Sequence, residues 1–352
     1  MRRVVVLVCV CILLISVLRF QRIPAAYTAP IVEPETAAPT EIETQPVLEG
    51  ELLLSVASID FSVVGESEDI CVGTADREYI LWESADESVI TVDNGVLTAV
   101  GVGSTTVTAT YGDQTVQCTA GCLAETEEEL YLLGEEVIRA PKRIPPVYEN
   151  PPLEFFDDAA LIGDSITYIM CKYEMSEGIL GHPTFLTRSG TGLCGLLYRY
   201  SNIVYRGEEI FVEDAVAATD SKKLFVMLGQ NDLGWRSVED TFADWQVFVD
   251  RIREKQPDAE FYIQSVIYEW NPTHIHNPRN DNIAIFNEKV IQFCKDNGHH
   301  YVDIQKYVED HTGRMASPYN LDDMLHLNLE GCVMWMHVLN NYAYLQTIGA
   351  NP

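Results

Sequence analysis

Basic residues are scarce in this sequence. Its 352 residues include 23 Lys and Arg but 53 Asp and Glu, so the formal net charge is −30. A surface this acidic repels the phosphate backbone of nucleic acids and the head groups of anionic lipids. We therefore expect no nucleic-acid partner and no docking on anionic lipid head groups. The charge favours a well-solvated exterior and does not indicate a substrate.

Cysteine spacings typical of metal or redox sites are also absent. Of the nine cysteines, two lie in the N-terminal apolar run, and the other seven form no CxxC pair and no metal-like spacing with histidine. If the chain is exported, disulfides are allowed, and Cys71 with Cys118 or Cys122 is the pairing to test. Buried free thiols are expected for the rest. We expect no metal and no organic cofactor.

The N-terminus reads as an export signal. Arg2 and Arg3 precede an apolar run from Val4 to Leu18, which is shorter than the usual spanning helix of about 20 residues. No clean small-x-small cleavage site follows it directly. We interpret residues 1–22 as an uncleaved signal anchor with its basic end inside, and a cleaved signal peptide is the alternative. Both interpretations predict an extracytoplasmic protein, anchored to the cell membrane or secreted.

Composition divides the remaining chain into four segments. Residues 23–51 are rich in Pro, Thr, Ala and Glu and form a linker. Residues 52–122 alternate apolar and polar side chains around two turn signals, Asn94-Gly95 and Gly112-Asp113, which predict β-hairpins. Residues 123–152 form an acidic, then proline-rich connector. Residues 153–352 form the second folded domain.

The run "WESADESVITVDNGVLTAVGVG" in the first of these folded segments resembles the bacterial Ig-like domain of group 2. The resemblance implies a small β-sandwich that acts as a spacer, or as an adhesive module that contacts an envelope glycan or protein. It carries over no ligand residues.

Apolar strand-like runs alternate with helix-like runs in residues 153–352. The predicted strands are "AALIG", "KKLFVMLG", "EFYIQSVIY" and "HHYVDI". Between them, two segments place apolar residues on one helical face, namely Phe242, Trp245, Val249 and Ile252, and then Ile283, Phe286, Val290 and Phe293. This alternation predicts an α/β fold with a parallel sheet covered on both faces, whose site lies at the carboxyl ends of the strands.

Three short segments supply groups for catalysis. Ser165 follows a strand and opens a helix, where its N–H has no helical acceptor and the helix end is partly positive. Asn231 follows the strand that ends at Gly229 and can donate its amide N–H to an oxyanion. His326 is the candidate base, and Asp323 can orient it, with Asp322 as the rival. Each residue alone has an ordinary structural explanation, and only the combination indicates an ester hydrolase. Thr167 replaces the second glycine of G-x-S-x-G, which disfavours an α/β-hydrolase elbow.

In order and spacing, "GDSIT", "GQND" and "DDMLH" resemble the three motifs of the SGNH (GDSL) hydrolase family over about residues 155–344. The resemblance implies a flavodoxin-like three-layer α/β/α domain. It implies Ser165 as nucleophile, Asp323 and His326 as its partners, and an oxyanion hole made by the N–H of Ser165, by Gly190 and by Asn231. The glycine segment "LTRSGTGLCGLL" departs from the family pattern because it lacks the usual neighbouring Asn, so Gly192 remains the alternative to Gly190.

We therefore expect an extracytoplasmic serine esterase that removes acetyl groups from a cell-envelope or extracellular polysaccharide. The triad rests on the motifs, whereas the polysaccharide rests on the export signal, the linker and the Ig-like segment. The alternatives are an O-acyltransferase with the same triad, a lipid esterase or thioesterase, and a non-enzymatic surface adhesion protein.

Overall fold

The computed structural model describes residues 49–271, 280–322 and 324–350. The predicted signal anchor and most of the predicted linker lie outside these residues. None of the helices in the described ranges is long and apolar enough to cross a membrane. The described residues all belong to one compact unit.

The N-terminal part, residues 49–124, consists of short strands in three small sheets and is called the β-rich part below. Its strands are β1 (Leu52–Leu54), β2 (Ser58–Val63), β3 (Ser67–Asp69), β4 (Cys71–Gly73), β5 (Leu81–Ser84), β6 (Ile90–Asp93), β7 (Val96–Ala99), β8 (Gly103–Tyr111) and β9 (Gln114–Ala124). The sheet orders are β1-β4, β3-β7-β6 and β10-β2-β9-β8-β5, in which β10 (Arg143–Ile144) comes from the connector. Both predicted hairpins are present, since β6 pairs with β7 and β8 pairs with β9, both antiparallel. Asn94 and Gly95 have the positive φ values, 47° and 86°, that the first turn requires.

The connector holds α1 (Glu127–Leu130), α2 (Glu135–Ile138) and β10 (Arg143–Ile144). Strand β10 joins the edge of the β-rich sheet by pairing with β2. Cys71, Cys118 and Cys122 are free and buried, so neither candidate disulfide is formed in the described residues.

The C-terminal part, residues 153–350, is called the α/β part. Its main strands are β11 (Ala159–Gly163), β12 (Thr184–Thr187), β15 (Lys223–Met227), β16 (Glu260–Gln264) and β17 (His300–Val302). All four pairings are parallel, and the spatial order is β12-β11-β15-β16-β17. This is the flavodoxin-like doubly wound order. The predicted α/β fold with a parallel sheet is therefore confirmed. Strand β12 was not predicted.

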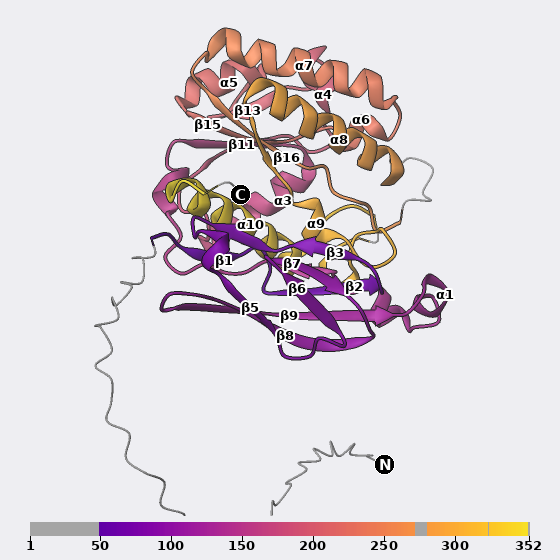
Figure 1. Ribbon diagram of the computed structural model, residues 1–352. Coiled ribbons are helices and arrows are strands. Elements are labelled where there is room, and N and C mark those ends of the chain that lie inside the picture. The colour runs from indigo at the N-terminus through magenta and orange to yellow at the C-terminus, as the bar shows by residue number, and fades with distance from the viewer. Residues whose placement is uncertain (1–48, 272–279, 323, 351–352) are drawn as a thin grey trace, which may run out of the picture. The chain divides into compact units, whose positions relative to one another are not determined.

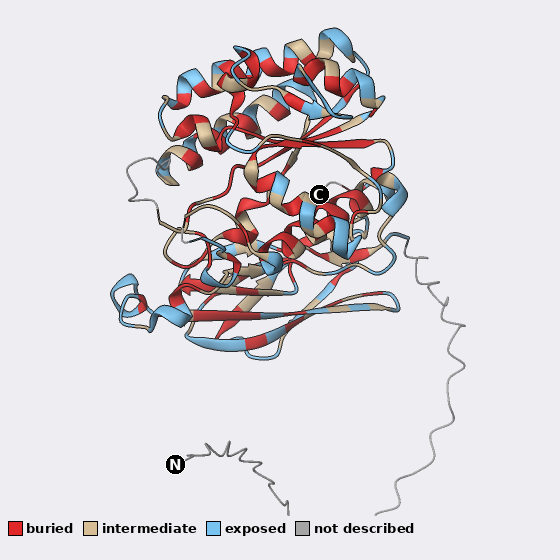
Figure 2. Cartoon of the chain, turned by 180° about the vertical axis from the view of Figure 1, so that it is seen from behind, coloured by how far each residue is buried: buried red, intermediate tan, exposed pale blue. Residues whose placement is uncertain are grey.

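Helices cover both faces of this sheet (Figure 1). They are α3 (Ser165–Glu177), α4 (Leu193–Leu197), α5 (Val212–Thr219), α6 (Gln230–Leu233), α7 (Val238–Lys255), α8 (Asn280–Asn297), α9 (Gln305–Val308) and α10 (Leu329–Thr347). The minor elements are the hairpin β13 (Ile203–Tyr205) and β14 (Glu208–Ile210), and three 3-10 turns, Arg77–Tyr79, Leu153–Phe156 and Ser317–Tyr319. Figure 2 shows the buried sheet between helices whose outer faces are exposed.

Alternate side chains of each strand enter two different cores. Leu161 and Phe225 join the core under α3 and α10, whereas Ile162 and Val226 join the core under α7 and α8. This alternation follows from the two-residue period of a strand. Both predicted helical faces are buried or partly buried.

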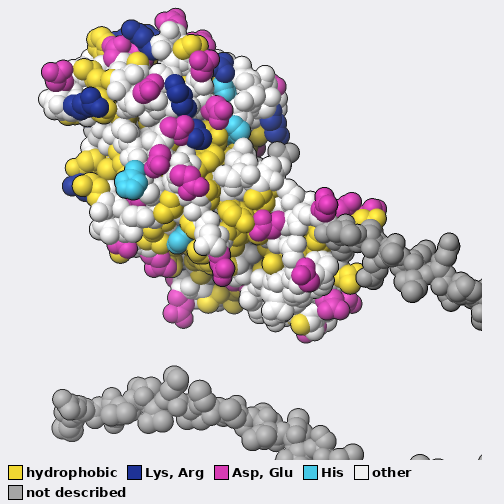
Figure 3. Space-filling view, turned by 90° about the vertical axis from the view of Figure 1, so that its left-hand side faces the viewer, with side chains coloured by type: hydrophobic (Ala, Val, Ile, Leu, Met, Phe, Trp, Pro, Cys, Tyr) yellow, Lys and Arg dark blue, Asp and Glu magenta, His cyan; other side chains and the backbone are white. Residues whose placement is uncertain are grey.

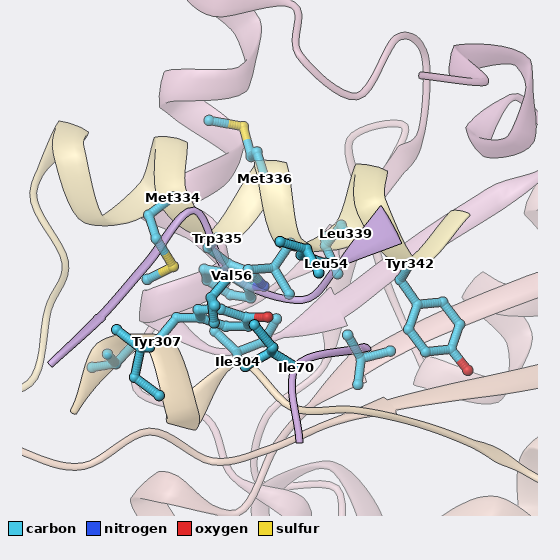
Figure 4. Close-up of a cluster of buried hydrophobic side chains, with 14 of the residues drawn as sticks. Leu54, Val56, Ile70, Ile304, Tyr307, Met334, Trp335, Met336, Leu339 and Tyr342 are labelled. Atoms are coloured by element: carbon cyan, nitrogen blue, oxygen red, sulfur yellow. The ribbon is translucent and has the colours of Figure 1, made fainter. Parts of the chain in front are cut away.

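The core under α10 continues into the β-rich part. In Figure 4, Leu54, Val56 and Ile70 of the β-rich part lie among Trp335, Tyr307 and neighbouring side chains of the α/β part. The Tyr307 hydroxyl also donates to the Ser55 carbonyl at 2.8 Å. The two parts therefore share one apolar core rather than resting on a flexible hinge.

Candidate active site

Ser165 is the first residue of α3, and β11 ends two residues earlier at Gly163. The turn is tight, because a Cβ atom on Gly163 would lie 2.0 Å from Thr167 Oγ1. Asp164 is the N-cap of the helix and accepts the Ile166 N–H at 2.9 Å. Among the described residues no acceptor lies on the Ser165 N–H. That N–H therefore remains available at the positive end of α3.

His326 brings a base to this serine. Its Nε2 atom lies 2.8 Å from Ser165 Oγ, and its Nδ1 atom contacts Asp322 Oδ2. Burial raises the pKa of the Asp322 carboxyl, but hydrogen bonds from the His326 side chain and from backbone amides outweigh it, so this pKa lies below its ordinary value. An ionised Asp322 can only accept, so Nδ1 carries the proton and donates it. The lone pair of Nε2 is then free to accept the Ser165 O–H.

Among the described residues, the carboxylate on Nδ1 is that of Asp322, the rival in the sequence analysis, and the orienting role of Asp323 stays a prediction. Asp323 lies outside the described residues, whereas Asp322 is the residue placed on Nδ1. The reason is a tight turn, in which Asp322 Oδ1 accepts the N–H groups of Met324, Leu325 and His326 at 3.1 to 3.3 Å. Once one oxygen is fixed in this turn, the other points at the imidazole four residues later.

The two ends of the loop that carries Asp322 and His326 are joined by backbone contacts. Leu321 donates its N–H to the His326 carbonyl at 2.9 Å, and Asn320 forms a bridge with Leu327. Asn328 then caps α10 by accepting the Gly331 N–H at 3.0 Å. The position of His326 is therefore set by the start of α10.

Asn231 connects the other two motifs. Its Nδ2 atom donates to Asp164 Oδ2 at 2.9 Å and to the Thr191 carbonyl at 2.7 Å. The amide is thus held beside the residue that precedes Ser165, at the carboxyl edge of the sheet. Both of its protons have acceptors here, so Asn231 donates to an oxyanion only by exchanging one of them. Its role in an oxyanion hole stays a prediction.

Asp164 was not assigned a role from the sequence, although it belongs to the "GDS" motif. It is 2% exposed, and burial raises the pKa of its carboxyl to about 6, opposed by the Ile166 N–H, the charge of His326 and the Asn231 amide. The sequence feature that could have indicated a capping role is its position directly before the serine that opens a helix, where Asp is a strong N-cap. Its second oxygen, bonded to Asn231, could not be read from the sequence.

The glycine segment lies against Asn231 through Thr191, which separates the two candidate glycines. Gly190 is exposed, has φ of +72° and has open space where a Cβ would stand. Gly192 is buried, and a Cβ there would lie 2.3 Å from Asp232 Oδ2. Asp232 uses its carboxylate to accept the N–H groups of Leu193 and Cys194, at 2.7 and 2.9 Å, and so holds the start of α4. Gly190 and Gly192 both remain candidates for the second backbone donor.

The described residues contain no group of three or more His, Cys, Asp or Glu side chains that is arranged to hold a metal ion. The chemistry that they do offer is a hydroxyl, a base with its carboxylate, and N–H donors beside them. This set suits nucleophilic attack on a carbonyl carbon.

Comparison with known proteins agrees with this geometry. Residues 161–332 match the family described as the GDSL-like lipase/acylhydrolase family. No curated protein matches the chain.

Several solved structures are similar in part. One is a GDSL-like lipase from Bacteroides thetaiotaomicron, with 13% identity, coverage of 56% of this chain and 92% of that chain, and a TM-score of 0.43. Another is a variant of an acetyl-xylooligosaccharide esterase from Geobacillus, with 17% identity, 54% and 93% coverage, and a TM-score of 0.38. A third, a family 3 carbohydrate esterase from Talaromyces cellulolyticus, has 15% identity, 54% and 97% coverage, and a TM-score of 0.39. At these identities and TM-scores, no substrate is carried over from them to this chain.

Proposed function

We propose that this chain is a serine esterase of the GDSL type, whose family model residues 161–332 match, and that it removes acetyl groups from a cell-envelope or extracellular polysaccharide. The observation that carries the esterase mechanism is the contact of His326 Nε2 with Ser165 Oγ at 2.8 Å, with Asp322 on Nδ1.

In this mechanism Ser165 Oγ bonds to the ester carbonyl carbon while its proton passes to His326 Nε2. The Ser165 N–H, a glycine N–H from residues 190–192 and the Asn231 amide hold the oxyanion. The protonated imidazole, stabilised by Asp322, gives its proton to the leaving sugar oxygen, and the acyl group stays on Ser165. His326 then takes a proton from water, the hydroxide releases acetate, and the proton returns to Oγ.

Two features support a carbohydrate outside the cytoplasm. The N-terminal run of apolar residues behind Arg2 and Arg3 has the pattern of an export signal. In addition, residues 52–122 resemble a bacterial Ig-like domain of group 2, and we propose that they form such a spacer. A spacer between a membrane anchor and a catalytic domain suits a substrate in the envelope.

The direct test uses Ser165→Ala. The purified variant should lose turnover of a short-chain aryl ester, while its thermal unfolding midpoint stays close to that of the unchanged protein. Turnover at the original rate would exclude Ser165 as nucleophile. A second assay then separates hydrolysis from transfer, since free acetate from acetylated glycans supports the esterase and acetyl groups on an added glycan support an O-acyltransferase.

A further inference from the structure

Three large aromatic side chains are exposed close to the motifs of the catalytic edge. Trp235 is 71% exposed, Tyr198 is 55% exposed and Tyr200 is 82% exposed. Residues of this type normally bury their rings. Their exposure leaves these rings open to a ligand at the surface.

Trp235 stands one helical turn beyond Asn231. Helix α6 contains Asn231 and is followed by Gly234 in helical conformation, and the Trp235 N–H donates to the Asp232 carbonyl at 3.0 Å. Residues four apart on a helix share one face and are separated by a rise of about 5.4–6 Å, so Trp235 follows Asn231 on the same face of this turn.

Tyr198 belongs to the same corner of the molecule. It is the C-cap of α4, the helix whose N-terminal N–H groups are held by the Asp232 carboxylate. Its hydroxyl donates to Asp244 Oδ1 at 3.3 Å. The phenol is thus anchored by its polar end, while more than half of its surface remains open.

Arg236 ties the two rings together. It forms an ion pair with Asp244 through the second carboxylate oxygen, and its Cζ atom lies 5.7 Å from the centre of the Trp235 ring. The charges of Arg236 and Asp244 therefore neutralise each other next to the two rings. The hydrogen bond of the Tyr198 hydroxyl restrains that ring before a ligand arrives, which lowers the entropy cost of binding.

We propose that Trp235, with Tyr198, forms a stacking surface for the uncharged sugar ring that carries the acyl group. This assignment rests on the proposed function and names its substrate class. A flat aromatic ring that is exposed to solvent suits the C–H face of a pyranose, because the sugar hydroxyls can remain in water. An acyl chain of a lipid would favour a closed apolar pocket instead. The net charge of −30 disfavours polyanionic glycans, and in Figure 3 acidic side chains are spread over the face drawn while basic ones lie in its upper part.

The test measures binding of partially O-acetylated xylo-, cello- and chito-oligosaccharides to the Ser165→Ala protein by tryptophan fluorescence and by calorimetry. At least one of these sugars should bind. Adding Trp235→Ala should weaken that binding on the order of tenfold, while Trp235→Phe keeps most of it because a ring remains. Tyr131→Ala is the matched control, since Tyr131 is 65% exposed at the end of α1.

With Ser165 intact, Trp235→Ala should raise KM for the bound oligosaccharide far more than it lowers kcat. Binding by none of the sugars, or binding that Trp235→Ala leaves unchanged, overturns the stacking surface. A separate outcome overturns the proposed function itself, namely that the unchanged protein hydrolyses neither these sugars nor a short-chain aryl ester.

Discussion

His326 Nε2 lies 2.8 Å from Ser165 Oγ, although 161 residues separate the two in the sequence. Ser165 opens α3, and His326 stands just before α10, which packs beside α3 on the same face of the sheet. The contact between these two side chains is therefore a consequence of how α3 and α10 pack. Substitutions in that core act on the reaction through the distance between these two side chains.

Asp322→Asn should lower kcat/KM of ester hydrolysis by roughly 10³ to 10⁴, because the amide no longer fixes the tautomer of His326 or stabilises its positive charge. The effect should fall mainly on kcat, since Asp322 touches the imidazole and not the substrate. Steady-state kinetics on a short-chain aryl ester measures it.

Asp323→Asn is the matched control for that experiment, because it makes the same chemical change one residue along. A larger loss for Asp323→Asn than for Asp322→Asn would return the orienting role to Asp323. Unfolding curves of both variants should overlay that of the unchanged protein to within about 1 kcal/mol.

Asn231→Ala should lower kcat by about 10² to 10³ with a small change in KM, if its amide moves from Thr191 or Asp164 to the oxyanion. The variant also leaves the Asp164 carboxylate and the Thr191 carbonyl without this donor, which costs about 1–3 kcal/mol of stability. Kinetics well below the melting temperature separates the two effects. A rise in KM alone would remove Asn231 from the oxyanion hole.

The sequence could place Ser165 and Asn231 at one edge of the sheet because both of their motifs follow strand ends. Ser165 and Asn231 each come directly after a buried apolar run, and the ends of parallel strands meet at one edge. The choice between Asp322 and Asp323 could not be made in this way, since it depends on a turn closed by three backbone N–H groups. Strand β12 was not predicted because "TFLT" is short, follows Pro183 and has only two apolar residues. The shared core of the β-rich and α/β parts could not be predicted either. Apolar periodicity shows that a face is buried, but it does not show which element covers that face.

His311 should make the protein less stable in acid. It is 6% exposed, its Nδ1 atom lies 3.0 Å from Ser62 Oγ of the β-rich part, and burial lowers its pKa to about 4, with Lys142 and Arg143 adding to the shift. Between about pH 6.5 and 4 the unfolded chain binds the proton and the folded chain does not, so stability is full above this window and falls as pH decreases through it.

At pH 5 the loss from His311 should be on the order of 1–2 kcal/mol relative to pH 7. Urea unfolding at the two pH values measures it, and His311→Gln should shrink the difference. His182→Gln is the control, because the His182 side chain is 92% exposed. Asp164 works in the opposite direction, since its raised pKa favours the folded state as pH falls below about 6, and its contribution cancels when variants are compared. An equal pH effect in both variants would rule out His311 as the source.

The two glycines of residues 190–192 should respond differently to alanine. In Gly192→Ala the new Cβ collides with the Asp232 carboxylate, which must then release the N–H groups of Leu193 and Cys194, at a cost of about 1–3 kcal/mol. Because Asp232 neighbours Asn231, kcat should fall as well. In Gly190→Ala the new Cβ contacts no other atom. The positive φ at this position costs an alanine about 1–2 kcal/mol, but the backbone N–H of residue 190 is still present as a donor. If that N–H serves the oxyanion, activity per folded molecule stays near the original value in Gly190→Ala and drops in Gly192→Ala. Urea unfolding and ester-hydrolysis kinetics on the same samples measure the stability and the activity of each variant. A greater loss of activity in Gly190→Ala than in Gly192→Ala would contradict this prediction.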